Sequence, residues 1–224
     1  FVLKKCLKKS SPVGPAAYRG TAVEDGVAHG LMNPGASLAE CVRVAEDKFN
    51  TLAAFISGEK VDKERKAISG MVEMALLELK PYGVPSSTQG AISHNFDGLL
   101  VPMIGYYDFE WEQHGVLTDL KTAHTLTSKI KPNHARQVAL YRAARGDNLE
   151  ARVTYITPKK RATYALENAR DHVVALGKIG LAIQKFLSLS DDPMELASFV
   201  MPDTDSFYFD EPLVRQQAYE IWGV

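Results

Sequence analysis

The stretch GYYDFEWEQHGVLTDLKTA, residues 105–123, decides the prediction of the fold. Aromatic and β-branched residues in its two halves predict two strands, and EQHG at 112–115 has the composition of a turn. Side chains alternate along a strand, so Asp119 and Lys121 share one face. A hairpin with this turn would bring Asp108, on the first strand, beside Asp119 on the second. We therefore expect two carboxylates and an ammonium group to converge near one end of a strand pair.

Further elements are predicted on both sides of this hairpin. Ser37 is a plausible helix N-cap, with Glu40 at the capping-box position. Helices are expected at about 18–32, 37–56, 62–79, 132–145 and 167–188, with shorter ones after 191–193 and from 210, and strands around Ile92 and at 99–112, 115–121, 151–157 and 161–167. This order suits an α/β or α+β domain, and we expect α/β: a mixed central sheet flanked by helices, with a C-terminal helical extension over about 167–224.

Composition limits the class of protein. The 224 residues are 46% hydrophobic, which is enough for one sizeable core, so we expect a single domain over 1–224. The 26 basic and 27 acidic side chains leave a net charge of −1. A neutral total does not exclude DNA as a partner, because affinity depends on where Lys and Arg lie. No apolar run approaches the ~18 residues of a membrane helix, so we expect no membrane partner and a cytoplasmic location.

The expected convergence of Asp108, Asp119 and Lys121 suits the hydrolysis of phosphodiesters. Two close carboxylates repel each other and favour a hard cation such as Mg²⁺, and the backbone carbonyl of Leu120 would add an oxygen ligand. A bound cation would polarise the phosphate and lower the pKa of a water molecule. Lys121 would orient that water or offset the charge of the transition state. The alternative is a solvated D-x-K pair at a strand edge, which is the commoner use of that tripeptide.

Four segments occur in an order that resembles a known family. They are RGTAVEDGVAH (19–29), GYYDFEW (105–111), VLTDLKTA (116–123) and HARQVALYRAA (134–144). Together they resemble the PD-(D/E)XK nuclease superfamily, in particular its RecB-like and phage lambda exonuclease-like branch, with a restriction-endonuclease-like core. The matches lie within residues 19–145. Each segment alone is unspecific, and the specificity comes from the ordered set.

The resemblance implies roles for particular residues. It implies that Gln137 positions active-site groups or the scissile phosphate, and that Tyr141 supports the site or contacts DNA. The catalytic set would be Glu24, Asp108, Asp119, Lys121, Gln137 and Tyr141, and the metal ligands Glu24, Asp108, Asp119 and the Leu120 carbonyl. Mg²⁺ would be the cofactor, with Mn²⁺ able to substitute. RecB-like relatives usually carry His where this chain has Glu24, and those with an iron–sulfur cluster use four cysteines. This chain has only Cys6 and Cys41, so we expect reduced thiols and no cluster.

Ordinary structural interpretations remain open beside these roles. Gln137 and Tyr141 are four residues apart and share a helix face, where a buried tyrosine with a polar neighbour would look the same. Glu24 alone would be read as a solvated helix residue, and Phe109 and Trp111 as core residues. Basic residues after the hairpin are candidates for DNA contact or simply solvated faces. They are Lys129, Lys131, Arg136, Arg142, Lys159 and Lys160.

The resemblance implies an activity and partners. The expected function is a Mg²⁺-dependent exonuclease that degrades linear double-stranded DNA from a 5′ end in phage or prophage recombination or DNA processing. A homo-oligomer (a trimer), a single-strand annealing protein as partner and the bacterial host cytoplasm as location follow from the same resemblance. Two alternatives are a structure-selective or nicking endonuclease of the same superfamily and a non-catalytic DNA-binding module with a degenerate nuclease fold. Covalently closed circular DNA separates the first alternative, because an exonuclease leaves it intact.

Overall fold

A computed structural model of the protein describes residues 1–9, 13–146 and 148–223. The chain forms two compact units: Phe1–Val13 together with Lys178–Val224, and Gly14–Gly177. All four segments that carry the resemblance lie in the second unit, which we call the sheet unit. The expectation of a single nuclease domain over 1–224 stays a prediction.

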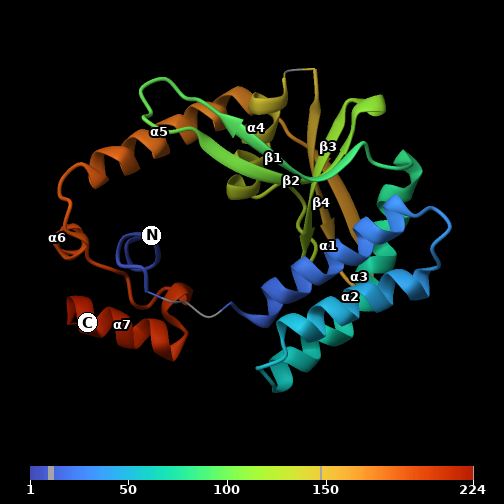
Figure 1. The fold of residues 1–224 in the computed structure, drawn as a ribbon, viewed down its shortest axis with the longest axis horizontal. Helices are drawn as coiled ribbons and strands as arrows, with labels where there is room; N and C mark the ends of the chain where they lie inside the picture. Colours follow the sequence, from blue (N-terminus) through green and yellow to red (C-terminus); the bar gives the residue numbers. More distant parts are fainter. Residues whose placement is uncertain (10–12, 147, 224) are drawn as a thin grey trace. The chain divides into compact units, whose positions relative to one another are not determined.

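The sheet unit is built on a five-stranded mixed sheet. Its strands are β1 (Ser87–His94), β2 (Met103–Trp111), β3 (Val116–Thr122), β4 (Glu150–Ile156) and β5 (Arg161–Ala165), which lie side by side in that order. The β3–β4 pair is parallel, and the other three pairs are antiparallel. The predicted α/β architecture with a mixed central sheet is therefore confirmed (Figure 1).

Helices cover both faces of this sheet (Figure 1). On one face, α1 (Pro15–Met32), α2 (Leu38–Leu52) and α3 (Glu59–Leu79) share a buried core with Phe109 and Trp111. On the other face, α4 (Pro132–Arg145) packs on a second core with residues of β2, β3 and β4. Both aromatic side chains, Phe109 and Trp111, are fully buried, as their interpretation as core residues required.

Local signals explain where two of the helices begin. Ser37 accepts a hydrogen bond from the Glu40 amide while the Glu40 carboxylate accepts one from the Ser37 amide, which is the predicted capping box of α2. Pro132 is the first residue of α4, where a missing N–H costs nothing. The expected extension of α2 to residue 56 is wrong, since the helix ends at Leu52.

The connection between β1 and β2 differs from the prediction. A strand was expected over 99–112, close behind a tight turn, but β2 begins only at Met103 and residues 95–102 form the connection. Pro102 explains the difference, because proline lacks the N–H that a ladder needs and restricts the residue before it. The turn between β2 and β3 is as short as expected. It is a 3₁₀ turn at Glu112–His114 followed by Gly115 at φ 58°, a left-handed conformation that suits glycine.

The remaining helices follow the sheet in sequence. They are α5 (Ala169–Leu187), α6 (Pro193–Ser198) and α7 (Pro212–Trp222), which agrees with the predicted series of C-terminal helices. Within the unit that contains both chain ends, Trp222 Nε1 donates a hydrogen bond to the Ala197 carbonyl at 2.8 Å and so links α7 to α6. Cys6 and Cys41 are free cysteines. Among the described residues, no helix has the length and apolar character needed to cross a membrane.

Candidate functional site

The hairpin places Asp108 and Asp119 next to each other in register. The β2–β3 ladder pairs Trp111 with Val116 and ends at Phe109 opposite Thr118, so the next residues in register are Asp108 and Asp119. Beyond the last pair, the Leu120 amide donates to Asp108 Oδ2 at 2.6 Å. The Asp108 side chain thus bonds to the β3 backbone where the regular β2–β3 ladder ends. Asp108 and Asp119 lie next to each other, as predicted.

The sheet is irregular at the same point on its other side. The β1–β2 pairing includes Thr88 with Phe109 and Gly90 with Tyr107, but it skips Gln89 and Asp108. Gln89 has φ 49°, a left-handed conformation that non-glycine residues rarely adopt and that concentrates at functional sites. Asp108 is therefore free of regular pairing on both sides.

The alternation of side chains between the two faces of β2 is also interrupted at Asp108. Tyr107 packs edge to face against Tyr141 of α4, with ring centroids 6.3 Å apart. Phe109 and Trp111 belong instead to the core under α1–α3, and Glu110 reaches Arg145 of α4. The side chains that face α4 thus shift from odd to even positions across Asp108. Such a local irregularity re-aims one side chain within an otherwise regular strand.

Glu24 reaches this point from helix α1. Its Oε1 accepts a hydrogen bond from Gln89 Nε2 at 2.7 Å, and its carboxyl group also interacts with Asp108. The neighbouring Asp25 is turned away and forms an ion pair with Lys48 of α2 at 3.0 Å. Of these two adjacent acids, Glu24 is therefore the one at the site, as the resemblance implied. Gln89 was missed, because nothing in its sequence neighbourhood indicates a left-handed backbone.

Lys121 and Asp119 share a face of β3 and form an ion pair. Asp119 is almost fully buried, whereas 27% of the Lys121 side chain is exposed. Asp119 Oδ1 also lies 3.3 Å from the Tyr141 hydroxyl. The D-x-K pair is therefore anchored at its acid end and accessible at its ammonium end, unlike the solvated strand-edge pair of the alternative interpretation.

Gln137 and Tyr141 lie on α4, on the other face of the sheet from α1 and Glu24. Gln137 Nε2 donates to the Tyr141 hydroxyl at 2.6 Å, and that hydroxyl donates to the Tyr106 carbonyl, also at 2.6 Å. Tyr141 is buried, and burial together with the Asp119 charge raises its pKa. It therefore stays protonated at neutral pH and supports the site from behind. Gln137 is only partly buried and lies nearer the solvent.

The three carboxyl groups disfavour one another's charge. Burial is the largest cause that raises the pKa of Asp108 well above its usual value, and the negative charges of Asp119 and Glu24 add to it. Burial also raises the pKa of Asp119, against the opposing effect of the Lys121 ammonium, and the pKa of Glu24, against its hydrogen bond from Gln89. A positive charge placed among these groups would relieve the repulsion.

The donor chemistry of these residues fits a hard divalent cation. Carboxylate and carbonyl oxygens are the ligands that Mg²⁺ prefers. Asp119 Oδ2 is buried and is in an ion pair with the Lys121 ammonium. Over the residues that the structure describes, no three His, Cys, Asp or Glu side chains lie in an arrangement that would hold a metal ion. The fit therefore rests on the kind of donor and on the mutual repulsion of the three carboxyl groups.

A buried ionic network lies behind the site and was not predicted. Arg19 of α1 is buried, forms an ion pair with Glu64 of α3, and donates to the Thr122 carbonyl at 3.2 Å. His124 Nε2 lies 3.0 Å from the Glu64 carboxylate. Burial raises the pKa of Glu64, but His124 and Arg19 together outweigh it and the pKa is lowered. The network ties the helix that carries Glu24 to the residue directly after Lys121.

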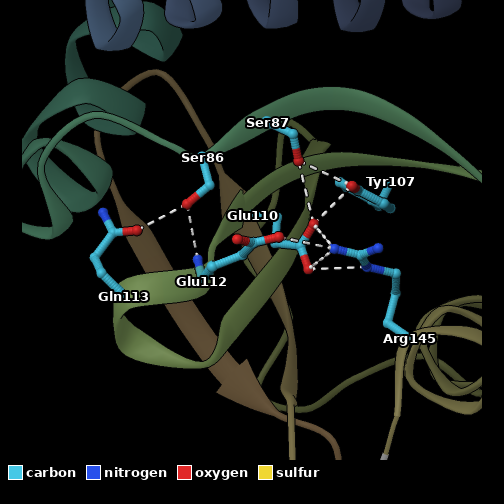
Figure 2. A network of polar contacts seen from close by, with 7 residues as sticks. All are labelled: Ser86, Ser87, Tyr107, Glu110, Glu112, Gln113 and Arg145. Atoms are coloured by element: carbon cyan, nitrogen blue, oxygen red, sulfur yellow. Dashed lines mark hydrogen bonds and ion pairs between the residues drawn. The ribbon is translucent and has the colours of Figure 1, made fainter.

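A second network fixes α4 against β2 (Figure 2). The buried Glu110 carboxylate accepts two hydrogen bonds from Arg145 Nη2 at 2.9 Å and one from the Tyr107 hydroxyl at 2.7 Å. Ser87 of β1 completes it, 3.2 Å from Glu110. Glu110 is two residues from Asp108, and Arg145 is four residues, about one helical turn, from Tyr141. This pair of Glu110 and Arg145, which we call the Glu110 clamp, therefore joins the part of β2 near Asp108 to the part of α4 near Tyr141.

Replacing Arg145 by alanine is expected to lower the free energy of unfolding by about 2–3 kcal/mol, because it leaves the buried Glu110 charge without its partner. Arg161 offers a matched control, since its side chain is equally exposed (37%) but pairs with the less buried Glu78. The same change there should cost less than about 1 kcal/mol. Urea denaturation of both variants measures the difference, and equal losses would show that the Glu110 clamp is not special.

His134 lies in the first turn of α4 and contacts β4. Its Nδ1 is 2.7 Å from the Tyr155 hydroxyl, and Tyr155 is paired directly with Lys121 across β3 and β4. Burial is the main cause that lowers the pKa of His134 to about 4, and the charges of Lys121 and Lys131 add to it. His134 is therefore neutral at physiological pH.

The depressed pKa of His134 predicts a loss of stability in acid. Between its ordinary pKa of about 6.5 and the folded value of about 4, the unfolded chain binds a proton that the folded protein does not, so stability falls as the pH falls. We expect the melting temperature of His134→Gln to decrease less than that of the wild type between pH 7 and pH 4.5. Parallel curves for the two proteins would contradict this.

The predicted DNA-contacting residues fall into three places. Lys129 and Lys131 are exposed in the loop before α4, and Arg136 and Arg142 are partly buried on α4 itself. Lys159 and Lys160 lie in the β4–β5 connection, where with His124 they line a cavity of about 430 Å³. The structure thus places basic groups along the loops that follow β3 and β4, and their contact with DNA stays a prediction.

Comparisons with known proteins identify no family for this chain. No protein-family model and no curated protein matches the chain. A solved structure described as the crystal structure of SSO0001 is 17% identical, with a TM-score of 0.39, over 91% of this chain and 95% of that one. A similarity of that size does not establish a shared fold or function.

Proposed function

We propose that the sheet unit, Gly14–Gly177, is a restriction-endonuclease-like core of the PD-(D/E)XK type and cleaves DNA phosphodiester bonds with Mg²⁺. The observation that carries the proposal is the convergence of Glu24, Asp108 and Asp119, with Lys121 beside them, where the β2–β3 ladder stops. The ordered resemblance of four sequence segments supports the same conclusion.

Each residue has a chemical part in this proposal. Glu24, Asp108, Asp119 and the Leu120 carbonyl would hold the cation, which when bound supplies charge for the phosphate and a water of lowered pKa. The accessible Lys121 ammonium orients the attacking water and offsets negative charge on the phosphate oxygens. Gln137 places the substrate from the wall opposite, while Tyr141 keeps Asp119 and the β2 backbone in position.

Phosphate contacts along the DNA come from the loops. Lys159 and Lys160 in the β4–β5 connection and Lys129 and Lys131 before α4 supply positive charge. Arg136 and Arg142 extend this set along α4. A chain with a net charge of −1 would thus bind DNA through a local surface and not through its overall charge.

Exonuclease action on linear double-stranded DNA from a 5′ end is the preferred form, and it comes from the resemblance alone. A homo-oligomer and a single-strand annealing protein as partner come from the same source. A nicking or structure-selective endonuclease is the second candidate, since the same carboxylates and lysine would serve it.

The test uses the purified protein with end-labelled linear duplexes, with and without a 5′ phosphate, and with covalently closed circular DNA. Degradation of linear DNA that needs Mg²⁺ or Mn²⁺ and leaves the circle intact is expected. Cutting of the circle would select the endonuclease. Binding of DNA with no cleavage under any divalent cation would refute the enzymatic proposal in favour of a non-catalytic module.

A further inference from the structure

A second cavity opens on the α4 side of the sheet, separate from the carboxylates. It has a volume of about 670 Å³ and lies between the loop before α4, strand β5 and the first turn of α5. Cavities of this size are typical of small-molecule sites, which are generally ~300–1,000 Å³. No residue of the proposed catalytic set lines it.

The cavity has an apolar wall and a charged rim. Ile130, Ala135 and Leu166 supply apolar surface, and the ring of Tyr164 lies beside them. Tyr164 is fixed in place, because its hydroxyl donates to the Thr127 carbonyl at 2.9 Å. Lys129 supplies an ammonium group and His172 an imidazole N–H that can donate to a phosphate, and Glu167 is the acidic residue of the rim. An aromatic surface with an ammonium and an imidazole group nearby suits a nucleobase joined to a phosphate.

A row of side chains connects this cavity to the catalytic lysine. Lys121 on β3 is directly paired with Tyr155 on β4. The ring of Tyr155 contacts that of Tyr164 on β5, with centroids 6.1 Å apart. Tyr164 is paired with Val153, two residues along β4 from Tyr155. Two strand spacings of ~4.8 Å and two residues of ~3.3 Å along the strand place the cavity floor roughly 12 Å from Lys121. A strand cleaved beside Lys121 would therefore extend to this cavity within a few nucleotides.

We propose that this cavity binds one nucleotide of the DNA strand held at the catalytic centre, with its base against Tyr164 and its phosphate at Lys129 and His172. The inference rests on the proposed nuclease function for its choice of ligand. Inorganic phosphate and a free product nucleotide share part of this chemistry, so the experiment includes both.

Binding is measured without divalent cations, so that it does not depend on cleavage. Deoxynucleoside monophosphates, inorganic phosphate and single-stranded oligonucleotides of a few nucleotides are titrated into the full chain by calorimetry and by NMR of the histidine and tyrosine side chains. We expect the oligonucleotide to bind more tightly than the mononucleotide, and the mononucleotide more tightly than phosphate, with Tyr164 and His172 signals shifted by both nucleotide ligands.

Two variants localise the site. Lys129→Ala combined with His172→Ala removes the ammonium and imidazole groups of the rim, and Ser128→Trp fills the cavity from an exposed position. Each should weaken oligonucleotide and mononucleotide binding at least tenfold, while Lys63→Ala on the exposed side of α3 should leave it unchanged. Unchanged binding in both cavity variants, or shifts confined to other residues, would overturn the proposal. Weaker mononucleotide binding with unaltered oligonucleotide binding would also overturn it, as a site for free nucleotide only.

The outcome is separable from that of the nuclease proposal. Nucleotide binding at the cavity without any Mg²⁺-dependent cleavage would reject the enzyme and keep the cavity assignment. Cleavage without nucleotide binding at the cavity would keep the enzyme and reject this site.

Discussion

Replacing Lys121 by alanine is expected to reduce Mg²⁺-dependent degradation of linear DNA at least ~10²–10³-fold, the typical effect of removing one group that stabilises transition-state charge. The ammonium group lies beside the buried Asp119 and is itself accessible to a substrate. We expect the variant to remain folded, since the side chain belongs to neither core, but to be less stable, because the buried Asp119 loses its ammonium partner. Single-turnover cleavage of a labelled duplex, with circular dichroism of the same preparation, measures both effects.

Lys66→Ala is the matched control, because Lys66 is an exposed lysine of α3 in the same unit. It should cleave at the wild-type rate. A folded Lys121→Ala protein that degrades DNA at nearly the wild-type rate would remove the D-x-K segment from the catalytic centre.

The second large effect is expected at Asp108, where activity and stability should change in opposite directions. Asp108→Asn removes one of three mutually repelling carboxylates, so cleavage should be lost. Burial and the charges of Asp119 and Glu24 raise the pKa of the wild-type group, which means that its ionised form destabilises the fold at neutral pH. A neutral amide of the same shape still accepts the Leu120 amide. We expect the melting temperature without divalent cation to rise by about 2–4 °C, or about 1 kcal/mol.

The control for this prediction is Asp97→Asn, because Asp97 is exposed in the β1–β2 connection. That change should leave the melting temperature within experimental error of the wild type. A lower melting temperature for Asp108→Asn would mean that the carboxylate stabilises the fold, and the assignment of this cluster as a cation site would lose its electrostatic basis.

The sequence predicted the hairpin well because its signals are local. The alternation of Asp119 and Lys121 and the short turn before Gly115 are set by residues a few positions apart. Together they place Asp108 opposite Asp119 without knowledge of the rest of the fold. The capping box of Ser37 and Glu40 and the proline at the start of α4 are local in the same way. The mixed sheet also followed from the order of elements.

The features that were missed depend on residues far apart in the chain. Arg19, Glu64 and His124 meet only after α1, α3 and the end of β3 have packed together, and no spacing in the sequence connects them. Gln89, which has a left-handed backbone, contacts a carboxylate 65 residues away in sequence, that of Glu24. The 670 Å³ cavity also depends on distant residues, since a loop, a strand and a helix form it together and none of them indicates a cavity by its own sequence.

The hydrogen bond from the Leu120 amide to Asp108 gives the protein an internal reporter. Most amide protons of the sheet bond to neutral carbonyls, but this one bonds to a carboxylate oxygen at 2.6 Å. Its chemical shift will therefore follow the charge on that oxygen, whether the charge changes by protonation or by a bound cation. One backbone resonance of a ¹⁵N-labelled sample can thus follow the electrostatic state of the cluster without substrate, label or turnover.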